Sequence, residues 1–499
     1  MPRNLPIFYS ALLLTIVNLL LRFVGTTFQV YISSVLGPAG VGLLQLVMSV
    51  GGLALVTGMA GIRTATMYLC AEELGRGKPK NVTWVLSGCF LYSILCSGTV
   101  AAGIYIFAPE IAEHWIGNME TVEALRLFAA FLPVTCLCGV MTGYFTAANR
   151  ISTLAAVEVV EQIASMAVTM GALTLWAGTD AGRACQCVIL GSCAGACLTL
   201  LCLVILRVRE RAAPGTPIPV RSRLLAAAVP LAMADVLKSG ISTTENLMVP
   251  KRLALNETVA SPLAAFGLVS GMVFPILMFP ACILFALAEL LIPELARCAA
   301  AGSRERICYL VRRSLKVAMV YGLLFGGLMF LLAEDLCMAI YNNAEAGAML
   351  KGYALLVPML YCDAIVDAMT KGLGQQKACV RYNILTNAMD VVFLYLLLPE
   401  YGMRGYYFSF LVTHLINFLL SLRRLLFITG LAIPIHVPVL AAASAIAAVC
   451  GCLHLKPGVL SVAAYPAFFG SCLCLLSIIG KEDLLWARGL IQKNDLTKR

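Results

Sequence analysis

The sequence predicts an all-α polytopic membrane protein, with two parallel six-helix lobes around a central cavity and two extra C-terminal helices. Three observations support this fold class. The 499 residues are 61% hydrophobic and only 12% charged, and their mean hydropathy of +0.90 lies outside the range of water-soluble proteins. Apolar stretches of membrane-spanning length recur along the chain. One pattern of proline and polar residues also occurs twice.

Apolar windows of about 20 residues, the length of helix that crosses the hydrocarbon, recur about 14 times. We expect a transmembrane helix at each of them. Their centres fall near Leu21, Gly52, Ile94, Pro133, Ala167, Gly195, Met233, Ile276, Leu324, Pro358, Phe393, Leu415, Ser444 and Gly470. An even number of spans places both termini on the same side of the membrane.

The distribution of basic residues predicts which side that is, because cytoplasmic loops retain Lys and Arg. Most of the 36 basic residues lie in segments that face the cytoplasm if the N-terminus does, including 63–80, 207–223, 297–313 and the tail from Lys481. We therefore expect a multi-pass plasma-membrane protein with both termini in the cytoplasm. Topology accounts for the net charge of +10, so nucleic-acid binding is not expected.

The internal repeat relates two parts of the chain by one constant offset in residue number. It pairs Pro133 with Pro358, Arg126 with Lys351, Glu158 with Asn383, Gln162 with Asn387 and Ser165 with Asp390. This offset covers six expected helices, so both copies enter the membrane from the same side, as in transporters whose two halves enclose the substrate route. We expect lobes at 1–210 and 211–430, an extra helix pair at 431–480 and a basic cytoplasmic tail at 481–499.

Charged side chains within the expected spans are costly unless they face a bundle interior or a watery cavity. Arg22 lies halfway along the first span. Its guanidinium suits an anionic headgroup such as a phosphate, which it can grip in two places. The alternative is a salt bridge that joins the lobes.

The span near Met233 carries Asp235, Lys238 and Glu245, whose spacings place them on one helix face. Asp235 and Lys238 either neutralise each other or contact a substrate or ion. Glu245 has no partner of opposite charge nearby in the sequence.

The span near Phe393 carries a stripe of Asn383, Asn387 and Asp390, and the repeat places Glu158 and Gln162 on the matching face of the span near Ala167. These stripes either lock each lobe through hydrogen bonds or line a cavity, where their oxygens would suit a hard cation.

Asp363 and Asp367 lie four positions apart near Pro358, close enough for one of them to hold a proton if both are buried. They are candidates for proton or cation coupling.

The chain lacks a Gly-rich phosphate loop and a Ser/His/Asp set, and only His414 of its four histidines falls within an expected span. The 20 cysteines lack the spacing with histidines that a zinc site needs. We expect no enzyme activity and no cofactor, with Na⁺ or H⁺ as a coupling ion.

Several segments carry a family resemblance. They include Arg22-Phe-Val-Gly, Ser34-Val-Leu-Gly-Pro-Ala-Gly, Gly61-Ile-Arg-Thr-Ala, Pro230-Leu-Ala-Met-Ala-Asp, Leu291-Ile-Pro-Glu-Leu, Lys371-Gly-Leu-Gly-Gln-Gln and Leu398-Pro-Glu-Tyr-Gly-Met-Arg-Gly-Tyr. Together they resemble the stage V sporulation protein B group of polysaccharide and lipid-linked oligosaccharide flippases. That group belongs to the exporter superfamily that includes the lipid II flippase MurJ and the multidrug and toxin extruders.

The resemblance implies a two-lobe fold with alternating access. It also implies a sodium site, to which Asp235, Asn383, Asn387, Asp390 and Thr413 offer comparable ligands. Arg22 matches the first cavity arginine of the lipid II flippases, but Phe28 stands at the later basic position of that helix. No mid-membrane arginine stands near Gly52 or Ile276, which is a further departure from the pattern of the lipid II flippases.

We therefore expect a flippase for a polyprenyl-phosphate-linked sugar, a precursor of peptidoglycan, spore cortex or surface polysaccharide. Arg22 would contact the phosphate, and Glu158, Gln162, Asp235, Lys238, Glu245 and Asn383 would line the route. The expected partners are the lipid-linked saccharide, the bilayer and proteins of cell-wall synthesis. The alternatives are a Na⁺- or H⁺-coupled multidrug antiporter and a membrane scaffold.

Overall fold

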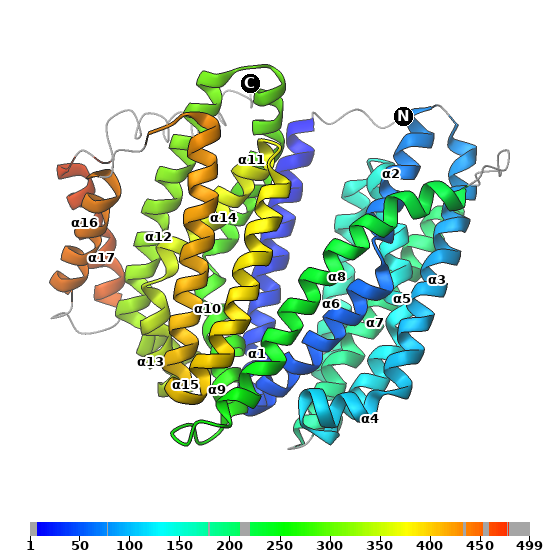
Figure 1. Cartoon of the computed structure of the whole chain (residues 1–499), viewed down its shortest axis with the longest axis horizontal. Helices are drawn as coiled ribbons and strands as arrows, with labels where there is room; N and C mark the ends of the chain where they lie inside the picture. The colour runs from blue at the N-terminus through cyan, green and yellow to red at the C-terminus, as the bar shows by residue number, and fades with distance from the viewer. Residues whose placement is uncertain are drawn as a thin grey trace. The chain divides into compact units, whose positions relative to one another are not determined.

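The computed structural model describes residues 7–76, 78–177, 180–209, 220–432, 436–452, 459–476 and 478. All regular structure in these ranges is helical, which confirms the predicted all-α class (Figure 1). The expected basic tail, 481–499, lies outside the described residues.

The helices follow one another with short connections. They are α1 (Ile7–Met59), α2 (Ile62–Gly75), α3 (Val82–Ile106), α4 (Ala108–Glu110), α5 (Val122–Ala147), α6 (Ile151–Ala172), α7 (Ala181–Arg209), α8 (Val220–Leu253), α9 (Pro262–Gly267), α10 (Phe274–Met278), α11 (Ala281–Ala300), α12 (Arg304–Tyr341), α13 (Ala344–Ala354), α14 (Val357–Gly372), α15 (Gln376–Thr429), α16 (His436–Cys452) and α17 (Val459–Leu475). Short π-helical turns, such as Leu268–Val273, and 3₁₀ turns, such as Met119–Thr121, join some of them.

Seven helical stretches in the described part are long and apolar enough to cross a membrane, or nine if each of two bent pairs forms one span. Every expected span centre lies within a helix. The count of about 14 spans nevertheless remains a prediction, because α8, α16 and α17 are not among these stretches.

The two longest helices each contain a break that the hydropathy pattern does not show. In α1 the break is at Gly37 (φ 67°, ψ 176°), which precedes Pro38. In α15 it is at Gly402 (φ 54°, ψ −133°). A residue with a β-carbon would be strained in either conformation. Each break divides its helix into two segments, in agreement with the two span centres expected in each helix.

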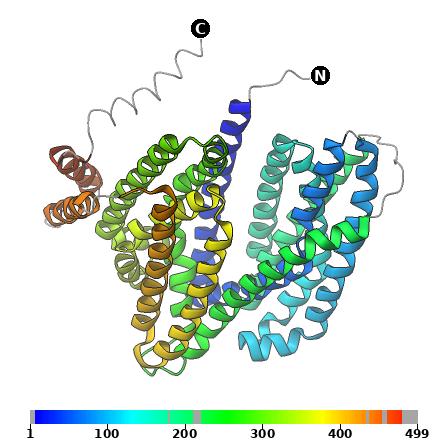
Figure 2. The same cartoon turned by 45° about the horizontal axis from the view of Figure 1, so that its top comes forward.

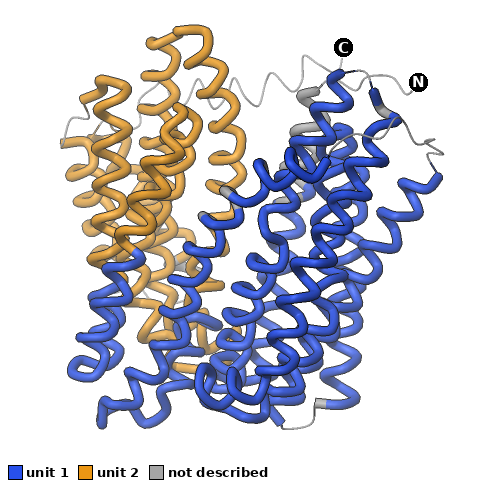
Figure 3. The backbone as a smooth tube through the Cα atoms, turned by 45° about the vertical axis from the view of Figure 1, so that its right-hand side comes forward, with its two compact units in different colours: residues 1–272, 387–409 blue, residues 273–386, 410–499 orange. Residues whose placement is uncertain are grey.

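The chain divides into two compact units (Figure 3). Unit 1 comprises 1–272 and 387–409, and unit 2 comprises 273–386 and 410–499. Because unit 1 includes a segment of α15, these units differ from consecutive lobes at 1–210 and 211–430. The lobes inferred from the repeat stay a prediction.

The internal repeat agrees with where corresponding helices begin, but the helices around its two prolines differ in geometry. The start of α6 at Ile151 and the start of α15 at Gln376 are separated by the same offset that relates Pro133 to Pro358. Pro133 lies inside the continuous helix α5. Its counterpart Pro358 lies in the first turn of α14, next to a bend of 57° between α13 and α14.

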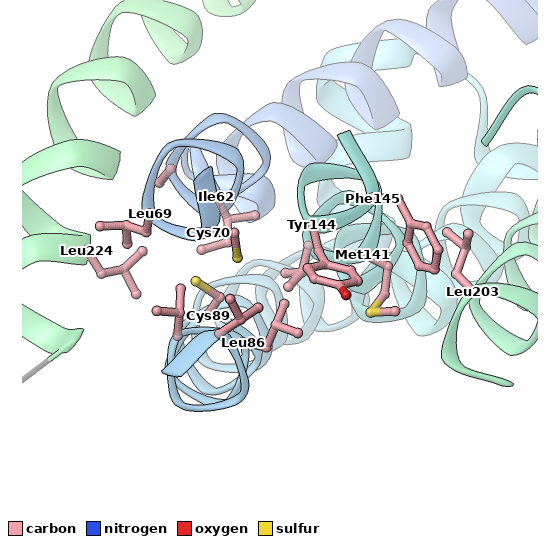
Figure 4. Packing of buried hydrophobic residues seen from close by; sticks show 14 of the residues in the cluster. Ile62, Leu69, Cys70, Leu86, Cys89, Met141, Tyr144, Phe145, Leu203 and Leu224 are labelled. Carbon is pink, nitrogen blue, oxygen red and sulfur yellow. The ribbon is translucent and has the colours of Figure 1, made fainter. Parts of the chain in front are cut away.

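A cluster of buried side chains holds α2, α3, α5, α7 and α8 of unit 1 together (Figure 4). Gly143 lets α5 approach α2 closely, because a β-carbon there would lie 2.5 Å from the carbonyl oxygen of Arg63. Small residues at such crossings are typical of helices packed in lipid. The labelled members of the cluster are Ile62, Leu69, Cys70, Leu86, Cys89, Met141, Tyr144, Phe145, Leu203 and Leu224.

In unit 2, α16 and α17 lie side by side and pack on α12 (Figure 2). The hydroxyl of Tyr465 on α17 donates a hydrogen bond of 2.9 Å to the carbonyl oxygen of Leu323 on α12. Tyr465 fits because Gly327 leaves room for its ring, since a β-carbon at Gly327 would collide with it. This contact fixes α17, one helix of the extra C-terminal pair, to α12.

Candidate functional site

One buried polar contact in unit 1 joins α8 to α15. Asp390 is 6% exposed and accepts a hydrogen bond of 2.5 Å from the hydroxyl of Ser409, which is fully buried. Glu245 on α8 is half-buried, and its carboxyl group interacts electrostatically with the carboxyl group of Asp390. The buried Tyr406 lies within electrostatic range of both acids. Two carboxyl groups and a hydroxyl thus meet at one point.

Two carboxylates in such contact repel each other unless a proton or a cation lies between them. The group formed by Glu245, Asp390 and Ser409, called here the carboxyl pair, therefore has the chemistry to hold a proton or a hard cation. The sequence placed Glu245 among substrate-binding residues and Asp390 among metal ligands. The fold brings the two acids together.

Asp235 and Lys238 lie earlier on α8, and both are exposed. Among the described ion pairs there is none between them. Asn387 is half-buried one turn before Asp390.

Asn383 and Thr413 belong to unit 2. Asn383 is half-buried, and the buried hydroxyl of Thr413 donates to the carbonyl oxygen of Phe410 over 3.4 Å. The sodium-ligand set that the resemblance implies is thus divided between the two units, and its assembly stays a prediction.

A second polar region of unit 1 lies where α1 meets α6. A β-carbon on Gly25 would lie 3.6 Å from the side-chain nitrogen of Gln162, so the two helices touch there. Arg22 lies one turn before this contact on α1, and Glu158 lies one turn before it on α6; both side chains are exposed or half-buried. The structure therefore places Arg22, Glu158 and Gln162 on adjoining helix faces.

Arg63 adds a second cation to this region. The distribution of basic residues in the sequence assigns Arg63 to a cytoplasmic segment. It is exposed, lies in the first turn of α2 and interacts electrostatically with Glu158 on α6. The signal was present in the segment Gly61-Ile-Arg-Thr-Ala, but only the packing of the helices in unit 1 shows that Arg63 and Glu158 approach each other. We call Arg22, Arg63, Glu158 and Gln162 the cationic face.

Not every polar residue of α6 is available for a ligand. The carboxylate of Glu161 accepts a hydrogen bond of 2.7 Å from the hydroxyl of Thr199 on α7. A β-carbon on Gly195 would lie 3.2 Å from the β-carbon of Ser165, so Ser165 also faces α7. These two residues contact α7, whereas the side chain of Gln162 lies beside Gly25 of α1.

Asp363 and Asp367 of unit 2 have separate partners. The side-chain amide of Asn417 on α15 donates to both carboxylate oxygens of Asp363, over 3.4 and 3.2 Å. Asp367 forms an ion pair of 2.5 Å with Lys371 on the same helix. Asn417 was not among the residues singled out from the sequence, because nothing in the local pattern indicates that α15 crosses α14 at this point.

Comparisons with known proteins agree with this architecture. The MatE family model matches residues 14–170. Stage V sporulation protein B of Bacillus subtilis (strain 168) is 22% identical over 414 residues, which cover 79% of this chain and 79% of that protein. The structure of the lipid II flippase MurJ in an inward closed conformation matches with a TM-score of 0.72 and 13% identity, covering 95% of this chain and 100% of that one.

An inward-facing multidrug resistance transporter of the MATE family matches with a TM-score of 0.63 and 14% identity, covering 84% of this chain and 100% of that one. Together with the helical fold, these matches show that the chain is similar in fold to membrane proteins of the multidrug, oligosaccharidyl-lipid and polysaccharide exporter superfamily. The match to stage V sporulation protein B agrees with the resemblance that the sequence segments carry.

Proposed function

We propose that this protein is an alternating-access flippase that moves a polyprenyl-phosphate- or pyrophosphate-linked sugar across the bacterial plasma membrane. The observation that carries the proposal is the cationic face: two arginines, Arg22 and Arg63, beside the polar side chains of Glu158 and Gln162. Guanidinium groups bind phosphate oxygens in two places, while carboxylate and amide groups accept and donate hydrogen bonds to sugar hydroxyls.

The relatives support the same class of cargo. The curated relative is a sporulation protein, and the MurJ match covers a larger share of this chain than the MATE match does. In the proposed orientation about 14 spans place both termini in the cytoplasm. The carboxyl pair on α8 and α15 then serves as the site of the coupling Na⁺ or H⁺.

A binding measurement tests the role of Arg22. Purified protein is titrated with a fluorescent polyprenyl-pyrophosphate-linked sugar. Arg22→Ala is expected to weaken binding about tenfold or more, because a charge-assisted hydrogen-bonded contact is lost. Arg22→Lys is expected to give an intermediate affinity, since it keeps the charge but loses the bidentate geometry.

Lys80→Ala is the matched control, because it removes an exposed cation from the loop between α2 and α3. Equal affinity of the parent and Arg22→Ala for the lipid-linked sugar would exclude the phosphate role of Arg22, whatever the cargo.

An ion-coupled antiporter of cationic drugs is the second candidate. The observation that favours it is the buried carboxyl pair, since acids within a membrane can exchange a cation for protons. Efflux of a cationic dye from proteoliposomes, driven by Na⁺ or H⁺ and abolished in Asp390→Asn, would support it if the lipid-linked sugar does not bind.

A further inference from the structure

We propose that unit 2 binds an anionic glycerophospholipid as a resident ligand, in a pocket between α12, α14, α15 and α16. The pocket has a volume of about 870 Å³, within the range of ligand-binding cavities. This inference is independent of the cargo, because all lining residues belong to unit 2 and the cationic face belongs to unit 1.

The wall of the pocket is mostly apolar. Met319 and Leu323 come from α12, Met359 from α14, Phe418 from α15 and Leu440 from α16. A void of this size between membrane helices would lose the packing contacts of every side chain around it. Lipids are the molecules available in a bilayer to fill this pocket, so we assign its apolar wall to contact with acyl chains.

The nitrogen-containing side chains that line the pocket are basic: they carry a positive charge or acquire one by taking up a proton. Arg312 and Lys316 lie four positions apart on α12 and so share a helix face, and His436 is the first residue of α16. No acidic side chain is among the described residues that line the pocket. This charge is complementary to a lipid phosphate and gives a preference for anionic over zwitterionic headgroups.

The place of the pocket argues for a resident lipid. Tyr465 ties α17 to α12, and α16 and α17 pack against each other and against α12. The pocket lies between α16 and the helices α14 and α15. A lipid bound there would fill the space between the C-terminal helix pair and the other helices of unit 2, and would stabilise the position of α16.

Native mass spectrometry of the full chain tests this assignment. The protein is purified in mild detergent and titrated with phosphatidylglycerol or phosphatidylcholine. We expect one phosphatidylglycerol to bind at least about tenfold more tightly than phosphatidylcholine, because two cations near a lipid phosphate contribute to the preference. The double variant Arg312→Gln/Lys316→Gln is expected to lose this preference.

Two further variants make the test specific. Lys377→Gln/Arg381→Gln removes an exposed basic pair with the same spacing from α15, outside the pocket, and is expected to keep the preference. Ala442→Trp places a large ring at a lining position and is expected to prevent binding of both lipids, with helicity by circular dichroism unchanged.

Three results would overturn the proposal. They are equal affinity of the parent for both lipids, equal loss of the preference in the two double variants, and displacement of phosphatidylglycerol by an equal concentration of polyprenyl phosphate. The last result would assign the pocket to the cargo lipid.

Discussion

At the scale of single residues, the carboxyl groups of Glu245 and Asp390 repel each other unless a proton or a cation from solution lies between them. Ser409 satisfies one oxygen of Asp390, but it cannot separate two negative charges. Asp390→Asn keeps a hydrogen-bonding group and removes one ionisable acid. We expect its transport rate to lose its dependence on a Na⁺ or pH gradient, measured in proteoliposomes with each gradient imposed in turn.

Asp390→Ala should also lower stability, because it removes the buried hydrogen bond that Ser409 donates to the carboxylate of Asp390. The expected loss is about 1–3 kcal/mol of unfolding free energy. Asp335→Asn, which changes an exposed acid of α12, is the control for both measurements. A gradient response that survives in Asp390→Asn would show that the coupling ion binds elsewhere.

A second residue-scale prediction concerns Glu73 at the end of α2. Its side chain is 2% exposed and pairs with Arg223 of α8 over 3.0 Å and with Arg76 over 3.1 Å, while Asn81 donates a further hydrogen bond. Glu73→Gln should lower the unfolding free energy by about 1–3 kcal/mol, because it weakens buried charge-assisted bonds.

Thermal unfolding in detergent measures this loss. The adjacent Glu72→Gln is the matched control, since Glu72 also pairs with Arg223, over 2.5 Å, but is 28% exposed. Exposed pairs contribute about 0–1 kcal/mol. Equal effects of the two substitutions would mean that burial of Glu73 does not strengthen its ion pairs.

The sequence showed which residue types are unusual inside a membrane, but not which of them meet. Glu245 and Asp390 are far apart in the chain, and their contact depends on how α8 packs on the segment of α15 in unit 1. Arg63 shows the same limit, because its relation to Glu158 requires the packing of α2 and α6 within one unit. A periodic pattern in the sequence shows which residues share a helix face, but it does not show which other helix packs against that face.

At the scale of elements, hydropathy located the helices well, because a stretch of apolar residues in lipid must satisfy its backbone hydrogen bonds within the helix. The breaks at Gly37 and Gly402 were not predicted, since each is a single residue within an apolar stretch. They set the direction of the following segment. The bend between α13 and α14 was likewise not predicted, because the repeat pairs Pro358 with Pro133, which lies inside a continuous helix.

The break at Gly37 gives a prediction about backbone conformation alone. Among the described residues, apart from the backbone nearby in the same helix, no atom lies within 4 Å of a β-carbon built on Gly37 or on Gly98, which is inside the helix α3. Gly37→Ala should destabilise the protein by about 1–3 kcal/mol because of its positive φ. Gly98→Ala should be neutral or stabilising by about 1 kcal/mol. Thermal unfolding of both variants in the same detergent compares them, and equal stabilities would contradict the assigned break.

At the scale of the whole molecule, the internal repeat led to the expectation of two lobes, and the matching starts of α6 and α15 keep its register. The compact units have different bounds, because unit 1 contains the segment of α15 that carries Asp390. The repeat relates residues by their position along the sequence, whereas the compact units group residues that pack together in space. Only packing shows that α8 and this segment share a buried polar contact.

Leaflet exchange of a fluorescent polyprenyl-pyrophosphate-linked sugar in proteoliposomes tests directly whether this protein is a flippase. A membrane-impermeant quencher on one side reports the label that has crossed. We expect exchange well above that of empty liposomes, retained in Lys80→Ala and reduced about tenfold or more in Arg22→Ala. Exchange no faster than in empty liposomes, from protein that binds the same lipid, would contradict this expectation.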